Sequence, residues 1–232
     1  MHNWVTATPE MRRNGLASAA AASAALFLRQ WIAHPRRMGG MMPSSPALAR
    51  LIARLVVVGG DGAVLELGPG TGALTAALLE AGLAEERLIL VEIDDRLHDH
   101  LRHRFPGVEV LHGDAASLTD LIPAGRRQQI STVVSSLPML CIPAAVQRVI
   151  VDQCFAATGP KGRLIQYTYS LSRRSPLDQR RLGLRGRRVG WILGNLPPVT
   201  VWRYRRATDF TPPTARDGAR GPGRDRPRSR AG

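Results

Sequence analysis

The segment VLELGPGTGALT, at positions 64–75, combines a carboxylate with three closely spaced glycines. Glu66 ends an apolar run, and Gly68, Gly70 and Gly72 follow it. Glycine lets backbone amides at a strand-to-helix turn face a ligand, because no Cβ stands in the way. A dinucleotide fingerprint has its third glycine one residue later, and a neighbouring carboxylate disfavours a phosphate. The pattern therefore favours a phosphate-free cofactor with a cationic amino group, as in S-adenosylmethionine.

Two further acidic residues follow predicted strands. Glu92 ends the run RLILVE, where its carboxylate can accept hydrogen bonds from both ribose hydroxyls. Asp114, in HGDAAS, can accept from the adenine amino group while the Ala115 amide donates. Because ligands of open α/β sheets bind at the carboxyl ends of strands, these residues predict one nucleoside site together with Glu66. The alternative is a glycine turn beside two helix caps, Asp94 and Asp114.

The loop after the fourth predicted strand bears on the methyl acceptor. Enzymes that methylate base amines usually carry Asn/Asp-Pro-Pro-aromatic here, to hold the amine and stack the base. This chain instead has Ser135, Ser136, Leu137, Pro138 and Met139, with no acid, amide or aromatic ring. We expect Leu137, Pro138 and Met139 to form an apolar border of the acceptor site that tolerates acyl chains, whereas ordinary turn chemistry is the alternative.

The fifth predicted strand ends with Tyr167 and Tyr169, which alternation places on one face. Tyrosine rings attract a methylated ammonium by cation–π interaction. That attraction persists through repeated methylation, whereas N–H hydrogen bonds are lost. We therefore expect both tyrosines in the catalytic site. The sequence shows no clear general base: Tyr169 is our choice, and a bound water or deprotonation of the amine on the lipid side are the alternatives. Packing of both rings on the sheet is the alternative.

Apolar strands alternate with amphipathic helices along the chain, which predicts a parallel sheet covered on both faces. After position 180, RRVGWILGNLPPVTVWRYRR predicts two antiparallel strands at the sheet's end. Ser45-Pro46 begins a helix, as N-cap and first helical residue. The fold class is α/β, a Rossmann-like seven-stranded sheet. The other predicted strands cover 63–67, 87–92, 108–112, 130–135 and 162–170, and the helices 72–82, 94–104, 115–122 and 143–157.

The net charge of +14 is unevenly distributed. Residues 47–160 carry 9 basic and 13 acidic side chains, and residues 161–232 carry 18 and 4. Nearly all the basic residues are arginines, which suit an anionic partner such as membrane lipid or nucleic acid. A solvated basic tail is the alternative.

The N-terminal region contains an uncharged run, 14–28, that is too short to span a bilayer comfortably. As a helix it places Phe27 and Trp31 on one stripe, which suits a membrane interface. A core-packed helix and a signal peptide are the alternatives. We divide the chain into a membrane-binding helix and linker (1–45), a catalytic domain (46–210) and a disordered basic tail (211–232).

Metal chemistry has no support in the sequence. Cys141 and Cys154 form no metal pattern, and we expect both to be buried thiols in a reducing compartment. The six histidines are scattered. We expect no metal.

Residues 63–170 resemble class I S-adenosylmethionine-dependent methyltransferases, through LELGPGTGALTAALLE, LILVEID and HGDA. From about Phe27 to Arg206 the chain is more specifically similar to bacterial phosphatidylethanolamine N-methyltransferases of the soluble, peripheral type. FLRQWIAHPRRMGGMMPSSPALARLI, SLPML, IQYTYS and NLPPVTVWRYRR carry that similarity. The core also resembles ribosomal RNA adenine dimethyltransferases, and the first and last stretches favour the lipid enzyme.

The resemblance implies a cytoplasmic enzyme held on the inner membrane by its N-terminal helix. It implies stepwise methylation of phosphatidylethanolamine to phosphatidylcholine, with an anionic membrane surface rather than a nucleic acid as partner. Ribosomal RNA adenine N6-dimethylation is the alternative activity. Ser44, Ile93 and Ser135 join the expected cofactor contacts. The lipid phosphodiester needs a cation, for which Arg36, Arg37, Arg173 and Arg174 are candidates. A solvated charge, or an interfacial one attracted to anionic lipid, is the alternative for each.

Overall fold

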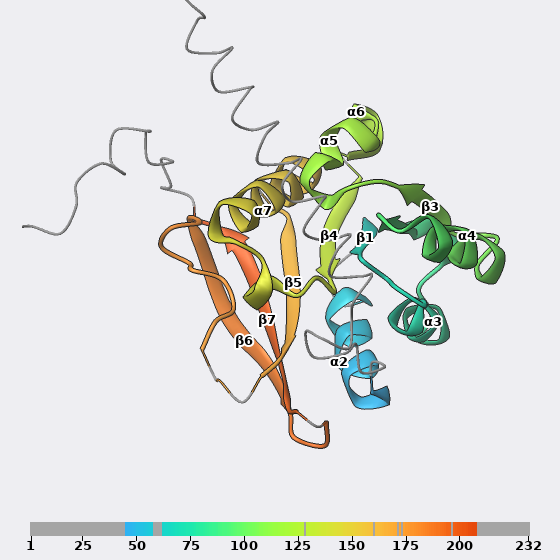
Figure 1. The fold of residues 1–232 in the computed structure, drawn as a ribbon. Helices are drawn as coiled ribbons and strands as arrows, with labels where there is room; N and C mark the ends of the chain where they lie inside the picture. The colour runs from blue at the N-terminus through green and yellow to red at the C-terminus, as the bar shows by residue number, and fades with distance from the viewer. Residues whose placement is uncertain are drawn as a thin grey trace, which may run out of the picture.

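The computed structural model describes residues 45–57, 62–127, 129–159, 161–170, 172, 174–195 and 197–207. They form one seven-stranded sheet in the order β3-β2-β1-β4-β5-β7-β6 (Figure 1). The strands are β1 (Ala63–Leu67), β2 (Leu88–Glu92), β3 (Glu109–His112), β4 (Ile130–Ser135), β5 (Arg163–Tyr169), β6 (Leu184–Ile192) and β7 (Val199–Arg206).

The first five strands are parallel to one another. β1 and β2 are buried along their whole length, as expected for apolar strands covered on both faces. Each of these five strands begins within one residue of its predicted start. The prediction of a Rossmann-like parallel sheet is therefore confirmed.

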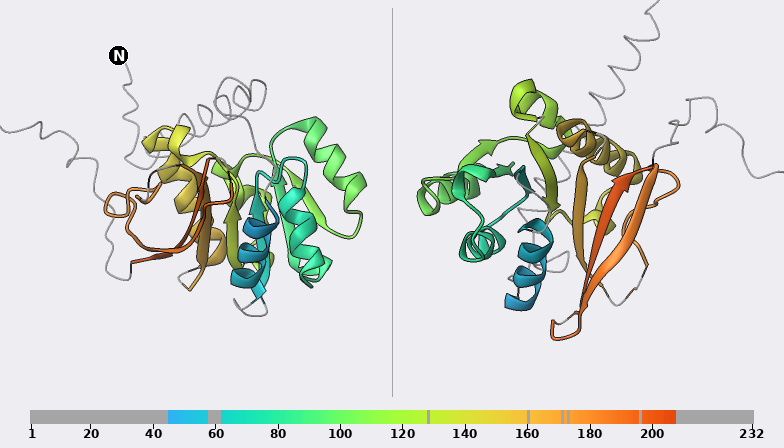
Figure 2. Two further views of the ribbon diagram at one scale, coloured as in Figure 1. Left: turned by 90° about the horizontal axis from the view of Figure 1, so that it is seen from below. Right: turned by 180° about the vertical axis from the view of Figure 1, so that it is seen from behind.

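Helices cover both faces of the sheet (Figure 2). α2 (Pro46–Val57), α3 (Ala73–Glu80) and α4 (Asp95–Arg104) contribute to one apolar core. The opposite core includes η3 (Ala115–Ser117), α5 (Leu118–Leu121) and α7 (Ala144–Thr158). Three short elements were not predicted: η2 (Glu85–Arg87), α6 (Ala124–Arg127) and η4 (Met139–Cys141).

The antiparallel pair at the end of the sheet is also confirmed, because β7 pairs with both β5 and β6. β6 begins at Leu184, three residues before the predicted start. A register shift near Gly190 lets Leu51 of α2 approach closely, since a Cβ on Gly190 would lie 2.1 Å from Leu51 Cδ2. None of the described helices is long and apolar enough to cross a membrane.

Candidate cofactor and acceptor site

The glycine turn joins β1 to α3 through three left-handed residues, with φ of 64° at Gly68, 60° at Gly70 and 79° at Gly72. A Cβ on Gly68 would lie 2.9 Å from Leu137 Cδ2, and one on Gly72 would lie 2.4 Å from Phe105 Cε2. The turn therefore needs glycine at these two positions for its own backbone and packing. That requirement is independent of any ligand.

Glu66 is a buried carboxyl near the end of β1, with no solvent exposure. Its Oε2 accepts a hydrogen bond from Thr75 Oγ1 of α3 at 2.8 Å, whereas Oε1 has no partner in the described part of the chain. Burial raises the pKa of Glu66 to about 7, with a further increase from the charge of Glu92, while the Thr75 bond acts in the opposite direction. Thr75 was not singled out from the sequence. Its place in the first turn of α3, after the glycines, could have indicated it.

Glu92 ends β2 and ties the glycine turn to that strand. Its Oε2 accepts from the Gly70 amide at 3.1 Å, and Oε1 accepts from the amides of Ile93 at 2.9 Å and Asp94 at 3.1 Å. Burial raises its pKa, and the three amide bonds oppose that shift. A carboxylate offers about four acceptor sites, so this arrangement leaves roughly one for a ribose hydroxyl. To accept hydrogen bonds from both ribose hydroxyls, as expected, the Glu92 carboxylate would have to lose one of these three amide hydrogen bonds.

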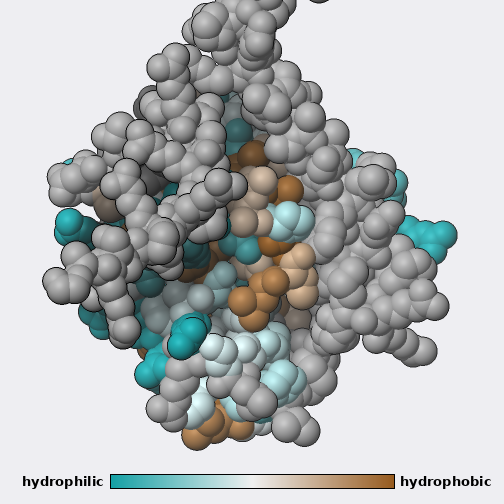
Figure 3. Space-filling model, turned by 60° about the vertical axis from the view of Figure 1, so that its left-hand side comes forward, coloured by the Kyte–Doolittle hydropathy of each residue, from teal (hydrophilic) through white to brown (hydrophobic). Residues whose placement is uncertain are grey.

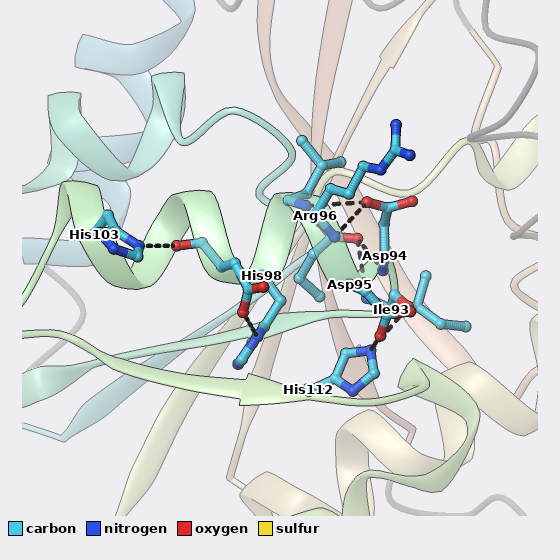
Figure 4. Close-up of polar contacts among 10 residues, drawn as sticks. Ile93, Asp94, Asp95, Arg96, His98, His103 and His112 are labelled. Carbon is cyan, nitrogen blue, oxygen red and sulfur yellow. Dashed lines mark hydrogen bonds and ion pairs between the residues drawn. The ribbon is translucent and has the colours of Figure 1, made fainter.

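The loops after β2 and β3 each contain an aspartate that caps the following helix. Asp94 Oδ1 accepts from the backbone amides of Arg96 and Leu97, both at 3.0 Å, and so begins α4 (Figure 4). Asp114 Oδ1 accepts from the Ala116 amide at 2.8 Å and begins η3. Both aspartates therefore cap helices, as the alternative predicted.

His112 connects the end of β3 to the loop after β2 (Figure 4). Its Nε2 lies 2.9 Å from Asp95 Oδ1 and 3.2 Å from the carbonyl oxygen of Ile93. Its ring also lies 5.2 Å from that of His98. These contacts keep the predicted cofactor residue Ile93 close to Asp114 across the strand ends.

Ser135 is the last residue of β4, and Ser136 begins the loop after this strand, which we call the acceptor loop. Ser135 is buried, and its Oγ accepts from the Leu137 amide at 3.3 Å. The Ser136 amide donates to the Leu67 carbonyl at 3.0 Å, and its Oγ accepts from the Tyr167 hydroxyl at 2.9 Å. Ser136 is thus the residue that links the glycine-turn strand to the tyrosine strand.

Leu137 is turned into the core rather than outward. It is 9% exposed and packs beside Gly68, while Pro138 is half-buried and Met139 is fully buried. Gln166 of β5 holds this conformation, since its Nε2 donates to the Leu137 carbonyl at 3.0 Å. The apolar border expected at residues 137–139 is therefore not formed by Leu137 or Met139, because both side chains are buried. Gln166 was missed because a single amide inside a strand has no distinctive spacing.

The two tyrosines share one face of β5, as predicted. Their rings lie 6.1 Å apart in an edge-to-face arrangement at 79°. Both are half-buried and pack against the core that contains α2. The packing alternative is therefore part of their environment, and the Tyr167 hydroxyl points to the acceptor loop.

The predicted site residues divide into two groups. The carboxyl ends of β1, β2, β3, β4 and β5 bring together one group at a single edge of the sheet. The other group, which includes the proposed membrane and phosphate contacts except Arg174, lies outside the described residues. The first group is Glu66, Gly68, Gly70, Gly72, Glu92, Ile93, Asp114, Ala115, Ser135, Leu137, Pro138, Tyr167 and Tyr169, and the second is Phe27, Trp31, Arg36, Arg37, Ser44 and Arg173.

Among the described residues, no group of three or more His, Cys, Asp or Glu side chains could hold a metal ion. Cys154 is a buried thiol, and burial raises its pKa to about 12. Cys141 is exposed, so the expectation that both thiols are buried is wrong for this residue. It is the last residue of η4.

Comparison with known proteins agrees with this geometry. The model of a family described as "Methyltransferase domain" matches residues 64–162. An ornithine lipid N-methyltransferase of Singulisphaera acidiphila is 31% identical over 146 residues, which cover 62% of this chain and 76% of the relative. Ribosomal RNA small subunit methyltransferase A of Phenylobacterium zucineum is 40% identical over 95 residues, covering 39% of this chain and only 31% of the relative.

The fold is also similar to that of solved methyltransferase structures. Magnesium protoporphyrin IX methyltransferase of Synechocystis, a structure with bound S-adenosylmethionine, superposes with a TM-score of 0.52 at 13% identity. The superposition covers 70% of this chain and 79% of the other.

The described residues fit that cofactor. Glu66 Oε1 is a buried acceptor without a partner, which suits an ammonium group, and the left-handed glycines hold the turn open beside Glu92. S-adenosylmethionine carries a cationic amino group and no phosphate, so it matches these carboxyls better than a dinucleotide does. The chain belongs to the class I S-adenosylmethionine-dependent methyltransferases.

Proposed function

We propose that this enzyme methylates the amine of a membrane lipid. Its substrates are phosphatidylethanolamine and the monomethyl and dimethyl forms, and its final product is phosphatidylcholine. The enzyme works in the cytoplasm, peripherally bound to the anionic surface of the inner membrane. The similarity to an ornithine lipid N-methyltransferase supports an amine-bearing lipid as acceptor.

The observation that carries the proposal is the chemistry of the acceptor side. The loop after β4 has hydroxyls and backbone carbonyls but no aromatic ring to stack a base. The Tyr167 hydroxyl of β5 donates a hydrogen bond to Ser136 Oγ of this loop at 2.9 Å, and the Tyr169 ring lies beside that of Tyr167. Aromatic faces attract an ammonium whatever its number of methyl groups, so this arrangement suits stepwise methylation.

When bound, S-adenosylmethionine supplies a methyl group on a sulfonium, whose leaving thioether is already activated. The protein's contribution is therefore mainly alignment and exclusion of water. Glu66 and Glu92 orient the cofactor from β1 and β2, and Ser136 with the tyrosines positions a neutral amine. Each transfer leaves an ammonium that must lose a proton before the next, and Tyr169, in its phenolate form, is the candidate acceptor of that proton.

The test is transfer of a radiolabelled methyl group by the full chain. Liposomes containing phosphatidylethanolamine, liposomes containing ornithine lipid, and small-subunit ribosomal RNA are offered separately. We expect label in the organic phase with phosphatidylethanolamine, distributed among mono-, di- and trimethylated products. Label only in ornithine lipid would change the substrate, and label only in RNA would overturn the proposal.

Ribosomal RNA adenine N6-dimethylation is the second candidate. The 40% identity to a ribosomal RNA methyltransferase over 95 residues and the basic C-terminal third favour it. The acceptor loop, with Met139 turned into the core where a stacking ring would be needed, opposes it. The RNA arm of the same assay decides between the two.

A further inference from the structure

Two large apolar side chains stand out as exposed in the described part of the chain: Leu140 at 56% and Leu193 at 63%. Leu140 lies in η4, after β4, and Leu193 directly follows β6. β4 and β5 are parallel, and β7 is antiparallel to both β5 and β6, so β4 and β6 end at the same edge. That edge also holds Glu66, Glu92 and Tyr169. In Figure 1 the β6–β7 turn is the lower tip of the sheet.

The exposure of Leu140 is built into its loop. Its neighbours Met139 and Ile142 are buried at 0% and 3%. Gln147 of α7 donates from Nε2 to the carbonyl of Met139 at 2.7 Å and to that of Ile142 at 2.9 Å. These bonds and buried anchors fix the turn, so Leu140 faces outward because of the loop's conformation.

The residues next to both leucines in the sequence are mostly apolar, and none is charged. Cys141, Pro143, Ala144 and Ala145 are exposed after Leu140, and Gly194 and Pro197 are exposed after Leu193. The sequence has no charged residue from 128 to 147 or from 189 to 202, although 22% of the chain is charged. Apolar surface is visible in the middle and at the lower end of the face drawn in Figure 3. We name the exposed residues of 140–145 and 193–197 the apolar rim.

The charged residues that border the apolar rim in the sequence are all arginines. Each uncharged segment is bounded by arginine, and Arg174 and Arg188 are exposed. No acidic residue occurs between 121 and 151 or between 179 and 207. Exposed leucines at this edge suit the acyl boundary of a bilayer, and the arginines that flank them in the sequence suit its anionic headgroups. RNA would gain little from the leucines.

We propose that the apolar rim inserts into the membrane interface, with Leu140 and Leu193 as its anchors. This inference rests on the proposed lipid substrate and goes further, because it sets the orientation of the enzyme. The edge with the cofactor carboxyls and the tyrosines then faces the bilayer. A headgroup amine can reach Tyr167 and Ser136 while its acyl chains stay in the membrane.

The test compares Leu140→Asp, Leu193→Asp and the double variant with Ala124→Asp. Ala124 is exposed and precedes β4, and the six-residue strand separates it from Leu140 by about 20 Å. Each single variant therefore adds one negative charge. The two leucine variants place it at the edge of the apolar rim, and Ala124→Asp places it at the opposite edge. Binding is measured by co-sedimentation with vesicles of phosphatidylglycerol and phosphatidylcholine, and cofactor binding by calorimetry.

We expect the double variant to bind vesicles at least about tenfold more weakly, because apolar insertion is lost. Ala124→Asp should change binding by less than about twofold, since its charge lies beyond the screening length. Cofactor affinity should be unchanged in all variants. Equal vesicle binding by the double variant and Ala124→Asp would overturn the proposal.

Two further readouts separate this inference from its premises. Methylation of a short-chain, water-soluble phosphatidylethanolamine should survive in the double variant, while methylation in vesicles falls. A wild-type chain that binds vesicles through the rim yet methylates no lipid would refute the proposed substrate and leave the rim intact. If wild type is a dimer by sedimentation and the double variant a monomer, the rim is a subunit interface and membrane insertion is wrong.

Discussion

Glu66 and Glu92 are buried carboxyls on the neighbouring strands β1 and β2, and both face the glycine turn. Burial is the main reason that the pKa of Glu66 rises to about 7, and the charge of Glu92 adds to it. The site thus contains a carboxyl that titrates in the neutral range. Its ionised form is the one that a cationic ligand prefers.

Cofactor affinity should therefore depend on pH. If the methionine ammonium binds ionised Glu66, binding requires this group to lose its proton below pH 7. Affinity should fall about tenfold between pH 8 and pH 6. Titration calorimetry in buffers of different ionisation enthalpy measures both the affinity and the released proton. Glu66→Gln should bind weakly without this dependence, and equal wild-type affinities at both pH values would contradict the role assigned to Glu66.

The same carboxyl should make stability depend on pH. The folded protein binds a proton more tightly than the unfolded chain, whose Glu66 pKa is 4.5. Its contribution is complete below the unfolded pKa and is lost as pH rises through about 7. That loss is on the order of 3 kcal/mol. Urea unfolding without cofactor should show Glu66→Gln gaining stability relative to wild type from pH 5 to pH 8. A constant difference would count against this pKa.

Substitutions at the tyrosines separate ring from hydroxyl. If Tyr167 acts by cation–π attraction, Tyr167→Phe should retain most activity, and Tyr167→Leu should raise KM roughly two- to thirtyfold for each methylation intermediate. Tyr169→Phe tests the proton acceptor, and loss of a general base should lower kcat by about a hundredfold or more. Steady-state kinetics on each methylation intermediate measure both. A neutral Tyr169→Phe would leave only the ring role for that residue.

Glycine 72 should be required for folding as well as for the cofactor. Gly72→Ala would strain a φ of 79° and place a Cβ 2.4 Å from Phe105 Cε2. Gly82 has a φ of 93° but open space around it, so Gly82→Ala is a matched control for backbone strain alone. We expect Gly72→Ala to cost about 1–3 kcal/mol more than the control, from overpacking. Denaturant unfolding without cofactor measures this, and equal costs would show that Phe105 moves aside freely.

Much of the fold follows from local patterns. Runs rich in β-branched and aliphatic residues predict β1 and β4 with correct bounds, although β1 includes Glu66, because strands covered on both faces of a parallel sheet are mostly apolar. The predicted strand began at Arg187 and so missed the first three residues of β6, where Arg185 and Gly186 interrupt the apolar pattern. They lie on an edge strand, where charged residues are tolerated.

The site was predictable to the level of strand ends, but not in its hydrogen bonds. The position of Glu92 after β2 follows from sequence, whereas its three backbone amides depend on how the glycine turn folds back. The inward turn of Leu137 and the outward turn of Leu140 depend on Gln166 and Gln147. Gln166 lies 29 residues from the Leu137 carbonyl that it binds and Gln147 lies 8 residues from that of Met139, so neither contact follows from the pattern of the loop alone.

The place of β7 between β5 and β6 has a consequence for synthesis on the ribosome. Until residues 199–206 emerge, β5 has an unpaired edge and β6 has no neighbouring strand. Open strand edges favour association with other chains. From the synthesis of residues 163–169 until β7 pairs with β5, the nascent chain therefore carries an open strand edge, which the last strand of the described residues closes.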